Sequence, residues 1–165
     1  MPLTNQEQKR YNRHIILHDI RIQGQEKIKE TSILVVGAGG LGSPILYYLT
    51  AAGVGHIGIM DDDVVSESNL QRQILYDTTH VGTPKVTVAT TKLKHPFTRI
   101  TPYFTRLSLD NALEIISEYD IVMDATDNLH ARYLINDACV KLGKPFVYGS
   151  ICEFCGQVSV FNYQN

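Results

Sequence analysis

The stretch Gly37-Ala38-Gly39-Gly40-Leu41-Gly42 joins two apolar segments of the chain. The run before it, 32–36, predicts a buried strand, and the stretch after it, 41–52, predicts a helix. Glycines permit a tight turn and a close approach of the backbone to a ligand. Free N–H groups at the start of the helix then point at that ligand, which favours phosphate. The stretch therefore predicts a strand–turn–helix unit that binds a nucleotide.

The acidic residue Asp61 ends the next apolar run, at about 20 residues beyond Gly42, a spacing that suits a carboxylate on a ribose hydroxyl. A P-loop is excluded, because Ser43-Pro44 stands where its Lys-Ser/Thr pair would be. A glycine turn with one carboxylate by itself favours an NAD-dependent enzyme. Use of the turn for packing alone is the weaker alternative.

The composition sets the class of protein. The chain has 165 residues, which suits one domain, and its net charge of -2 and pI near 6.3 leave no basic block for a nucleic acid. No apolar run approaches the ~18 residues of a membrane span, and the first residues lack the pattern of a signal peptide. Three cysteines indicate a reducing compartment. We therefore expect a cytoplasmic protein with no membrane segment and no nucleic-acid partner.

Strands and helices alternate along the chain. Strands are expected at 32–36, 57–60, 99–104, 120–124, 146–148 and 158–161. Helices are expected at 5–14, 25–30, 41–52, 109–117, 128–142 and from Thr83-Pro84 to before Pro96. This alternation predicts an α/β fold with a doubly wound, mostly parallel, Rossmann-like sheet. Residues 1–31 are expected to form an N-terminal helical arm, and residues 32–165 the nucleotide-binding domain.

The loop after the second strand carries more polar side chains than a dinucleotide site requires. It offers Asn69, Gln71 and Arg72, and Lys85 follows on the first turn of the next helix. Two cations beside a glycine loop can neutralise a triphosphate, which hydride transfer does not need. On charge pattern alone, a solvated loop with a surface lysine is an equal alternative.

Two further residues have open interpretations. Asp127 follows strand 120–124, at the edge where doubly wound sheets bind ligands, but it is equally suited to cap helix 128–142. Arg13 lies on an expected amphipathic helix, where an arginine is usually solvated.

The cysteines and histidines give weaker signals. Cys152-Glu-Phe-Cys155 has the spacing of half a zinc site or of a redox pair, but Cys139 stands alone and no second pair exists. Metal binding and redox chemistry are both minor alternatives there. His14 and His18 have no third ligand and are expected at the surface or in packing.

Several motifs occur in a fixed order along the chain. They are Arg-Tyr-Asn-Arg-His-Ile-Ile-Leu at 10–17, the glycine turn, Asn69-Leu-Gln-Arg-Gln73, Gly82-Thr-Pro-Lys85, Asp124-Ala-Thr-Asp-Asn128 and Gly156-Gln157-Val158. Together they resemble the MoeB/ThiF family, the bacterial relatives of ubiquitin-activating enzymes. The resemblance covers almost the whole chain, and linked motifs are far more specific than one glycine turn.

The resemblance implies ATP-dependent adenylation of a protein C-terminus. The substrate would be a ubiquitin-like sulfur carrier ending in Gly-Gly, in molybdopterin or thiamine synthesis. The residues that the resemblance implies for ATP binding are Gly37, Gly39, Gly40, Gly42, Asp61, Asp63, Asn69, Gln71 and Asn128. Those that it implies for catalysis are Arg13, Arg72, Lys85 and Asp127. Asp127 would hold Mg²⁺, and Arg13 would reach across a homodimer to the partner's ATP.

These residue types suit the chemistry. A carboxylate nucleophile is already ionised, so the enzyme must neutralise phosphates and align the attack rather than supply a general base. One carboxylate is enough for Mg²⁺ that also binds phosphate oxygens. The alternatives are adenylation of a modified tRNA base or small peptide by the same domain type, an NAD-dependent oxidoreductase, and a non-catalytic nucleotide-binding or dimerisation module.

Full-length members of the family continue with further strands, a loop over the active site and cysteine pairs that bind structural zinc. We therefore expect residues 32–165 to form the ATP-binding domain in a C-terminally truncated form. Structural zinc is expected only in a longer form of the protein.

Overall fold

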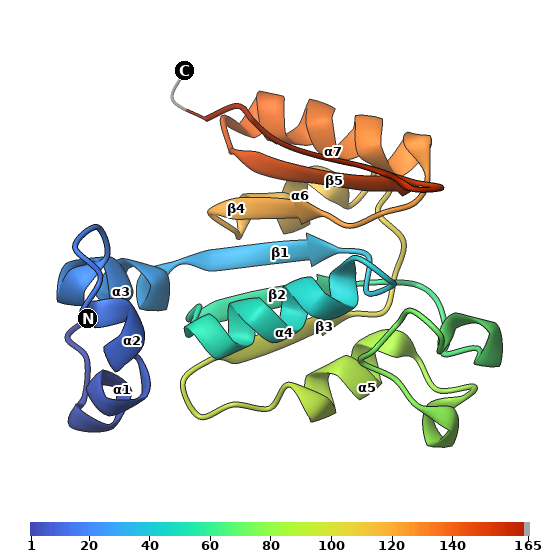
Figure 1. Ribbon diagram of the computed structural model, residues 1–165. Coiled ribbons are helices and arrows are strands. Elements are labelled where there is room, and N and C mark those ends of the chain that lie inside the picture. The colour runs from blue at the N-terminus through green and yellow to red at the C-terminus, as the bar shows by residue number, and fades with distance from the viewer. Residues whose placement is uncertain (164–165) are drawn as a thin grey trace.

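The computed structural model describes residues 1–163 (Figure 1), and residues 164–165 of the expected domain 32–165 lie outside the described part. The strands are β1 (Ser32–Val36), β2 (His56–Met60), β3 (Arg99–Tyr103), β4 (Ile121–Asp124), β5 (Phe146–Cys152) and β6 (Cys155–Phe161). The α-helices are α1 (Asn5–Arg10), α2 (Asn12–Ile15), α3 (Arg21–Glu30), α4 (Gly42–Ala52), α5 (Lys85–Lys92), α6 (Ala112–Ser117) and α7 (Leu129–Leu142). Two short 3₁₀ helices are η1 (Glu67–Asn69) and η2 (Thr78–His80).

Within the described residues the strands form one six-stranded sheet in the order β3-β2-β1-β4-β5-β6. Neighbouring strands from β3 to β5 run parallel, and β6 runs antiparallel to β5. The chain passes from β3 at one edge to β4 beside β1, so the winding direction reverses between β1 and β4. Such a reversal opens a crevice at the carboxyl ends of the strands. The predicted doubly wound, mostly parallel, Rossmann-like sheet is confirmed.

Alternating side chains of β1 pack on opposite faces of the sheet, where the core forms two layers. Ile33 and Val35 pack in the layer that includes residues of α4 and α5. Leu34 and Val36 pack in the opposite layer, with residues of α6 and α7. Successive strand residues point to opposite faces, so the continuous apolar run of β1 is what a sheet covered on both faces requires. Figure 1 shows α4 lying across the sheet on the first of these faces.

The turn between β1 and α4 requires two residues without a Cβ atom. Gly37 has φ 96°, and a Cβ atom there would lie 2.6 Å from the carbonyl oxygen of Ala125. A Cβ atom on Gly42 would lie 2.0 Å from the carbonyl oxygen of Gly37. Both spaces are closed by backbone atoms, so a side chain cannot be accommodated by rotating a neighbour. The first turn of α4 therefore folds directly against the end of β1 and the loop after β4.

The helices α1, α2 and α3 lie beside the amino-terminal ends of the strands (Figure 1). Glu7 is 2% exposed, and its carboxylate pairs with Lys29 Nζ at 2.8 Å. Gln25 Nε2 donates to the carbonyl oxygen of Ala52, at the end of α4, at 2.8 Å. These contacts attach the three helices to the end of α4. The division into an arm of 1–31 and a domain of 32–165 stays a prediction.

Several element boundaries differ from the expectation; α6, for example, begins at Ala112 rather than at 109. The helix expected over 5–14 is broken at Tyr11, although the capping box between Thr4 and Glu7 is present. The α3 helix begins at Arg21 and runs through Gly24, whose low helix propensity hides this first turn. The last two strands extend toward each other and form a hairpin, because cross-strand pairing overrides the weak strand propensity of their glycines and serine.

Among residues 1–163, every helix falls short of the length and apolar character that crossing a bilayer requires.

Replacing Gly42 with alanine tests whether the turn has space for a side chain at this position. Alanine is favoured over glycine by about 1 kcal/mol in a helix, so a position with space would gain stability. Because the added methyl group would meet the Gly37 backbone, we expect the free energy of unfolding to fall by about 1–3 kcal/mol instead. Urea denaturation followed by circular dichroism measures the change.

Gly39→Ala is the matched control within the same turn. Its Cβ atom would lie 3.4 Å from Nε2 of the Gln73 side chain, which is ordinary contact with a group that can move. We expect this variant to stay within about 0.5 kcal/mol of the wild type. A Gly42→Ala chain at least as stable as the Gly39→Ala chain would contradict the steric account of the turn.

Candidate functional site

A cavity of about 580 Å³ lies at the crevice between the carboxyl ends of β1 and β4. This volume is typical of small-molecule sites. The predicted residues that line it are Gly37, Gly39, Gly40, Asp61, Asp63, Asn69, Arg72, Lys85, Asp127 and Asn128. They come from the glycine turn, the loop after β2, the start of α5 and the loop after β4. The fold thus brings most of the predicted site residues to one cavity.

The remaining predicted residues do not line the cavity. Gly42 lies beneath the turn against Gly37, where it shapes the turn rather than the wall. Gln71 is exposed outside the cavity, and Gln73, which is 4% exposed, lines it instead. Arg13 is exposed on α2, beside the opposite ends of the strands (Figure 1). A role for Arg13 at a cavity of this kind therefore needs a second copy of the chain.

Both backbone polar groups of Ala38, in the glycine turn, are hydrogen-bonded to side chains. Asp61 Oδ2 accepts a hydrogen bond from the Ala38 N–H at 2.7 Å, and Asp61 Oδ1 accepts one from the Asp63 N–H at 2.8 Å. The hydroxyl of Tyr76 donates to the Ala38 carbonyl oxygen at 2.8 Å. Burial raises the pKa of the Asp61 carboxyl, against the opposing effect of its N–H donors. Asp61 therefore fixes the turn as well as facing the cavity, and Tyr76 is a supporting residue that the sequence did not indicate.

Two side chains from the loop after β2 cover the glycine turn. Arg72 lies over Gly40, since a Cβ atom there would be 3.5 Å from its Cδ atom. Gln73 lies over Gly39 in the same way, at 3.4 Å from its Nε2 atom. Within residues 1–163 the Oε1 atom of Gln73 is buried without a hydrogen-bond partner. A buried amide oxygen of this kind is an acceptor available to a ligand.

The predicted lysine is buried in the cavity wall. Lys85 is 3% exposed, and its Nζ atom lies 2.8 Å from Asp63 Oδ2 and 3.9 Å from Asp61 Oδ1. An ammonium group this deep requires such a carboxylate partner. Since an ammonium has three N–H donors, Lys85 can keep this pair and still donate to an anion in the cavity.

The loop that carries Asp127 is held by two residues that the sequence analysis did not single out for this role. Asp124 Oδ1 accepts from the Thr126 N–H at 2.9 Å and from its hydroxyl at 2.7 Å. Arg132 Nη2 donates to the Thr126 carbonyl oxygen at 2.9 Å, and its Nε atom lies 4.0 Å from Asp124 Oδ2. Burial raises the pKa of the Asp124 carboxyl. The sequence signals for Asp124 were its position at the end of a buried strand and its place in the 124–128 motif, and Arg132 had none.

The capping role considered for Asp127 belongs to its neighbour. Asn128 is the N-cap of α7, and its Oδ1 atom accepts from the Ala131 N–H at 2.8 Å. Asp127 lines the cavity, and within residues 1–163 the structure gives its carboxylate no hydrogen bond or ion pair. A carboxylate without a protein partner that lines a cavity suits a magnesium ligand.

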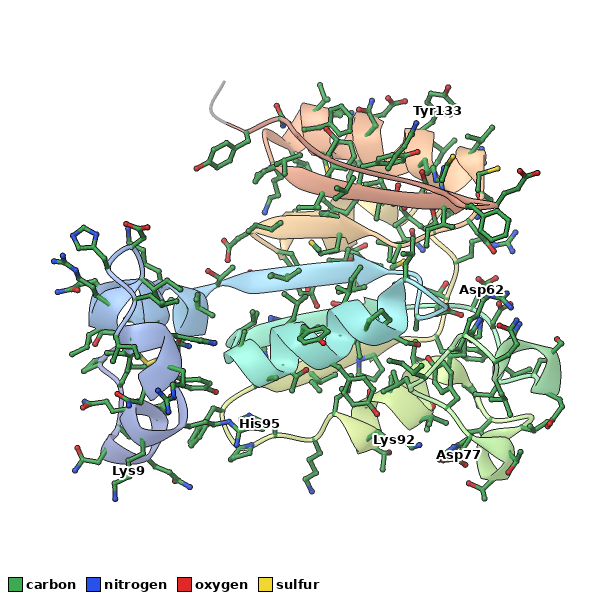
Figure 2. All side chains as sticks on the ribbon, viewed as in Figure 1. Lys9, Asp62, Asp77, Lys92, His95 and Tyr133 are labelled. Carbon is green, nitrogen blue, oxygen red and sulfur yellow. The ribbon has the colours of Figure 1, made fainter. Side chains whose placement is uncertain are left out.

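A cation at the cavity mouth was not predicted. Arg106, from the loop after β3, lines the cavity, and its Nε atom lies 3.1 Å from Asp62 Oδ2. Figure 2 shows Asp62 beyond the carboxyl ends of the strands. Because Arg106 is 77% exposed, this pair is a surface salt bridge of small energy that a ligand can displace.

Sequence comparison finds close relatives along the whole chain. A "Sulfur carrier protein adenylyltransferase" of Thermus thermophilus is 52% identical over 165 residues, which is 99% of this chain and 61% of the relative. A "Probable molybdopterin-synthase adenylyltransferase" of Porphyra purpurea is 51% identical over 161 residues, which is 96% of this chain and 42% of the relative. The chain thus spans about half the length of these curated relatives.

Solved structures share the fold. The E. coli tRNA N6-threonylcarbamoyladenosine dehydratase TcdA in complex with ATP has a TM-score of 0.80 and 26% identity, over 88% of this chain and 60% of that chain. E. coli MccB with ATP has a TM-score of 0.70 and 25% identity, over 76% of this chain and 38% of that chain. The ThiF family matches residues 11–165, which include every element around the cavity. The predicted family resemblance is therefore confirmed, and the chain belongs to the ThiF family.

Proposed function

We propose that this chain is the nucleotide-binding part of an adenylyltransferase, which uses ATP to activate the C-terminal glycine of a ubiquitin-like sulfur carrier. The observation that carries the proposal is the placement of Arg72 and Lys85 beside the glycine turn, in one cavity with Asp61. Two cations at the phosphate end suit a triphosphate, whereas a dinucleotide cofactor needs none there. The names of the relatives at about half identity support the class of substrate.

ATP binding is assigned to the walls of the cavity. The N–H groups of the glycine turn face the phosphates at the start of α4, and Asp61 accepts from the ribose. Gln73 replaces Gln71 in this proposal, because it is the glutamine that lines the cavity. The remaining assigned residues are Gly37, Gly39, Gly40, Asp63, Asn69 and Asn128, with Gly42 shaping the turn.

The proposed reaction exchanges one bond at the α-phosphorus. A carboxylate oxygen of the carrier's last glycine attacks this phosphorus, and the bond to the bridging oxygen of the β-phosphate breaks. The products are an acyl-adenylate and pyrophosphate. Arg72 and Lys85 neutralise the charge that builds on the leaving pyrophosphate. Asp127 would hold Mg²⁺, which supplies further neutralisation of phosphate charge when bound.

A related reaction is the second candidate. TcdA, whose name refers to a modified tRNA base, has the same fold at a TM-score of 0.80 but shares only 26% identity with this chain. The sulfur-carrier relative shares 52% identity. We therefore favour the carrier protein as substrate over a tRNA base or a small peptide. We also propose a cytoplasmic setting, because all three cysteines are free in the structure.

Isothermal titration calorimetry with ATP tests the nucleotide. Asp61→Ala removes both the proposed ribose contact and an anchor of the turn, so we expect ATP binding to weaken by about 1–3 kcal/mol. Asp137→Ala is the matched control, because Asp137 is exposed on α7 outside the cavity, and this variant should bind ATP like the wild type. Tight NAD binding without ATP binding would reject the proposal.

ATP–pyrophosphate exchange in the natural protein tests the chemistry. We expect exchange only when a carrier ending in Gly-Gly is added. Arg72→Ala or Lys85→Ala should each lower its rate by ~10²–10³, the usual effect of losing one preorganised charge. Lys92→Ala is the control, since Lys92 pairs with Asp77 at the surface, away from Asp62 and the cavity (Figure 2).

Two outcomes of that assay would reject the mechanism. One is a wild-type rate in the Arg72→Ala, Lys85→Ala double variant. The other is ATP binding with no exchange for any carrier, which would leave a nucleotide-binding module without catalysis.

Mixing two inactive variants tests the proposed homodimer, in which Arg13 serves the partner's cavity. In a mixed dimer of Arg13→Ala and Arg72→Ala chains, one cavity carries both changes and the other carries neither. Random mixing makes half of the dimers mixed, and each mixed dimer has one intact cavity out of two. We therefore expect about a quarter of the wild-type activity to return. No recovery after subunit exchange, or a monomer in sedimentation with ATP present, would contradict the shared site.

A further inference from the structure

The two exposed cysteines face each other across the tip of the β5–β6 hairpin. Cys152 and Cys155 are the last register pair of the two strands, and only Glu153 and Phe154 lie between them. Both thiols are free and exposed. Side chains directly opposite on antiparallel strands project from the same face of the sheet. The two thiols therefore lie side by side on one face of the hairpin.

The spacing of the strands suits a bond between the two sulfur atoms. Opposite residues on antiparallel strands have Cα atoms about 4.5–5.5 Å apart, and disulfides join residues whose Cα atoms are about 4.4–6.8 Å apart. The turn keeps this spacing fixed, because Glu153 adopts the left-handed conformation, with φ 53°, that a two-residue hairpin requires. The Cα spacing of the pair therefore lies within the range that a disulfide spans.

Metal binding by the same pair has less support. A structural zinc site takes four ligands, and two thiolates supply half of them. Among residues 1–163 the only group of three or more ligand-type side chains close enough to hold a metal is Asp61, Asp62 and Asp63, which belongs to the cavity. Within residues 1–163 the hairpin pair thus has no third ligand-type side chain close enough to complete a site.

We propose that Cys152 and Cys155 form a reversible dithiol–disulfide site that reacts by exchange with a small disulfide such as oxidised glutathione. One cysteine thiolate attacks a sulfur of the small disulfide, forms a mixed disulfide and releases one small thiol. The second cysteine thiolate then attacks the protein sulfur of that mixed disulfide and releases the other small thiol. The cysteine pair is oxidised by two electrons, the small disulfide is reduced to two thiols, and the two cysteine protons end on those thiols.

The third cysteine supplies an internal reference. Cys139 lies on the buried face of α7 and is 0% exposed, and burial raises the pKa of its thiol to about 12. Exchange requires an accessible thiolate, so Cys139 should stay reduced under conditions that oxidise the hairpin pair.

Intact mass spectrometry of the chain in mixtures of oxidised and reduced glutathione tests the proposal. We expect the wild type to lose two hydrogens, retain no glutathione and keep one thiol that is alkylated after unfolding. Excess reduced glutathione should restore all three thiols. Cys152→Ser and Cys155→Ser change exposed residues at the tip, and each should instead retain one glutathione on the remaining cysteine.

Three results would overturn this site. They are two glutathiones on the wild-type chain, a disulfide between two chains on a non-reducing gel, and bound zinc that protects both thiols from oxidation. Circular dichroism of the two serine variants confirms that the comparison is between folded chains.

Discussion

The contact between the first turn of α4 and the end of β1 is the constraint on which the rest of the site depends. At Gly37 and Gly42 the backbone occupies the space in which a side chain would begin. This closeness brings the turn against Ala125 in the loop after β4, so two loops that are far apart in the sequence become the floor of one cavity. Gly39 and Gly40 also leave the turn without side chains of its own between its backbone and an anion.

The cavity wall is already partly neutralised in the absence of a nucleotide. Lys85, Arg106 and Arg132 each lie within salt-bridge distance of a carboxylate. Within the described residues Arg72 has no such partner. A phosphate in the cavity would therefore meet no competing carboxylate at Arg72, whereas at Lys85 it would share the ammonium with Asp63. This difference makes Arg72 the cation with the least competition for phosphate.

The parts of the fold that local sequence determines could be predicted. Apolar runs with strand length and the glycine turn depend on neighbouring residues, and they were enough to derive the sheet and the position of the site. The break at Tyr11 was not predictable, because it results from packing of that ring against Gly53 on a distant part of the chain. The choice between Gln71 and Gln73 also depended on the path of an irregular loop, which has no period to indicate an inward face. The pair of Asp124 and Arg132 required knowledge of how α7 lies on β4.

The attachment of the amino-terminal helices has a geometric consequence for assembly. The ion pair of Glu7 and Lys29 and the bond from Gln25 to Ala52 hold these helices at the amino ends of the strands, whereas the cavity opens at the carboxyl ends. If Arg13 of each chain is to reach the cavity of the other, the strands of the two chains must run in opposite directions. The twofold axis is then perpendicular to the strands rather than parallel to them. In that arrangement each chain gives and receives one arginine by the same rotation. A pair of sheets aligned in the same direction would leave both arginines a full strand length from either nucleotide.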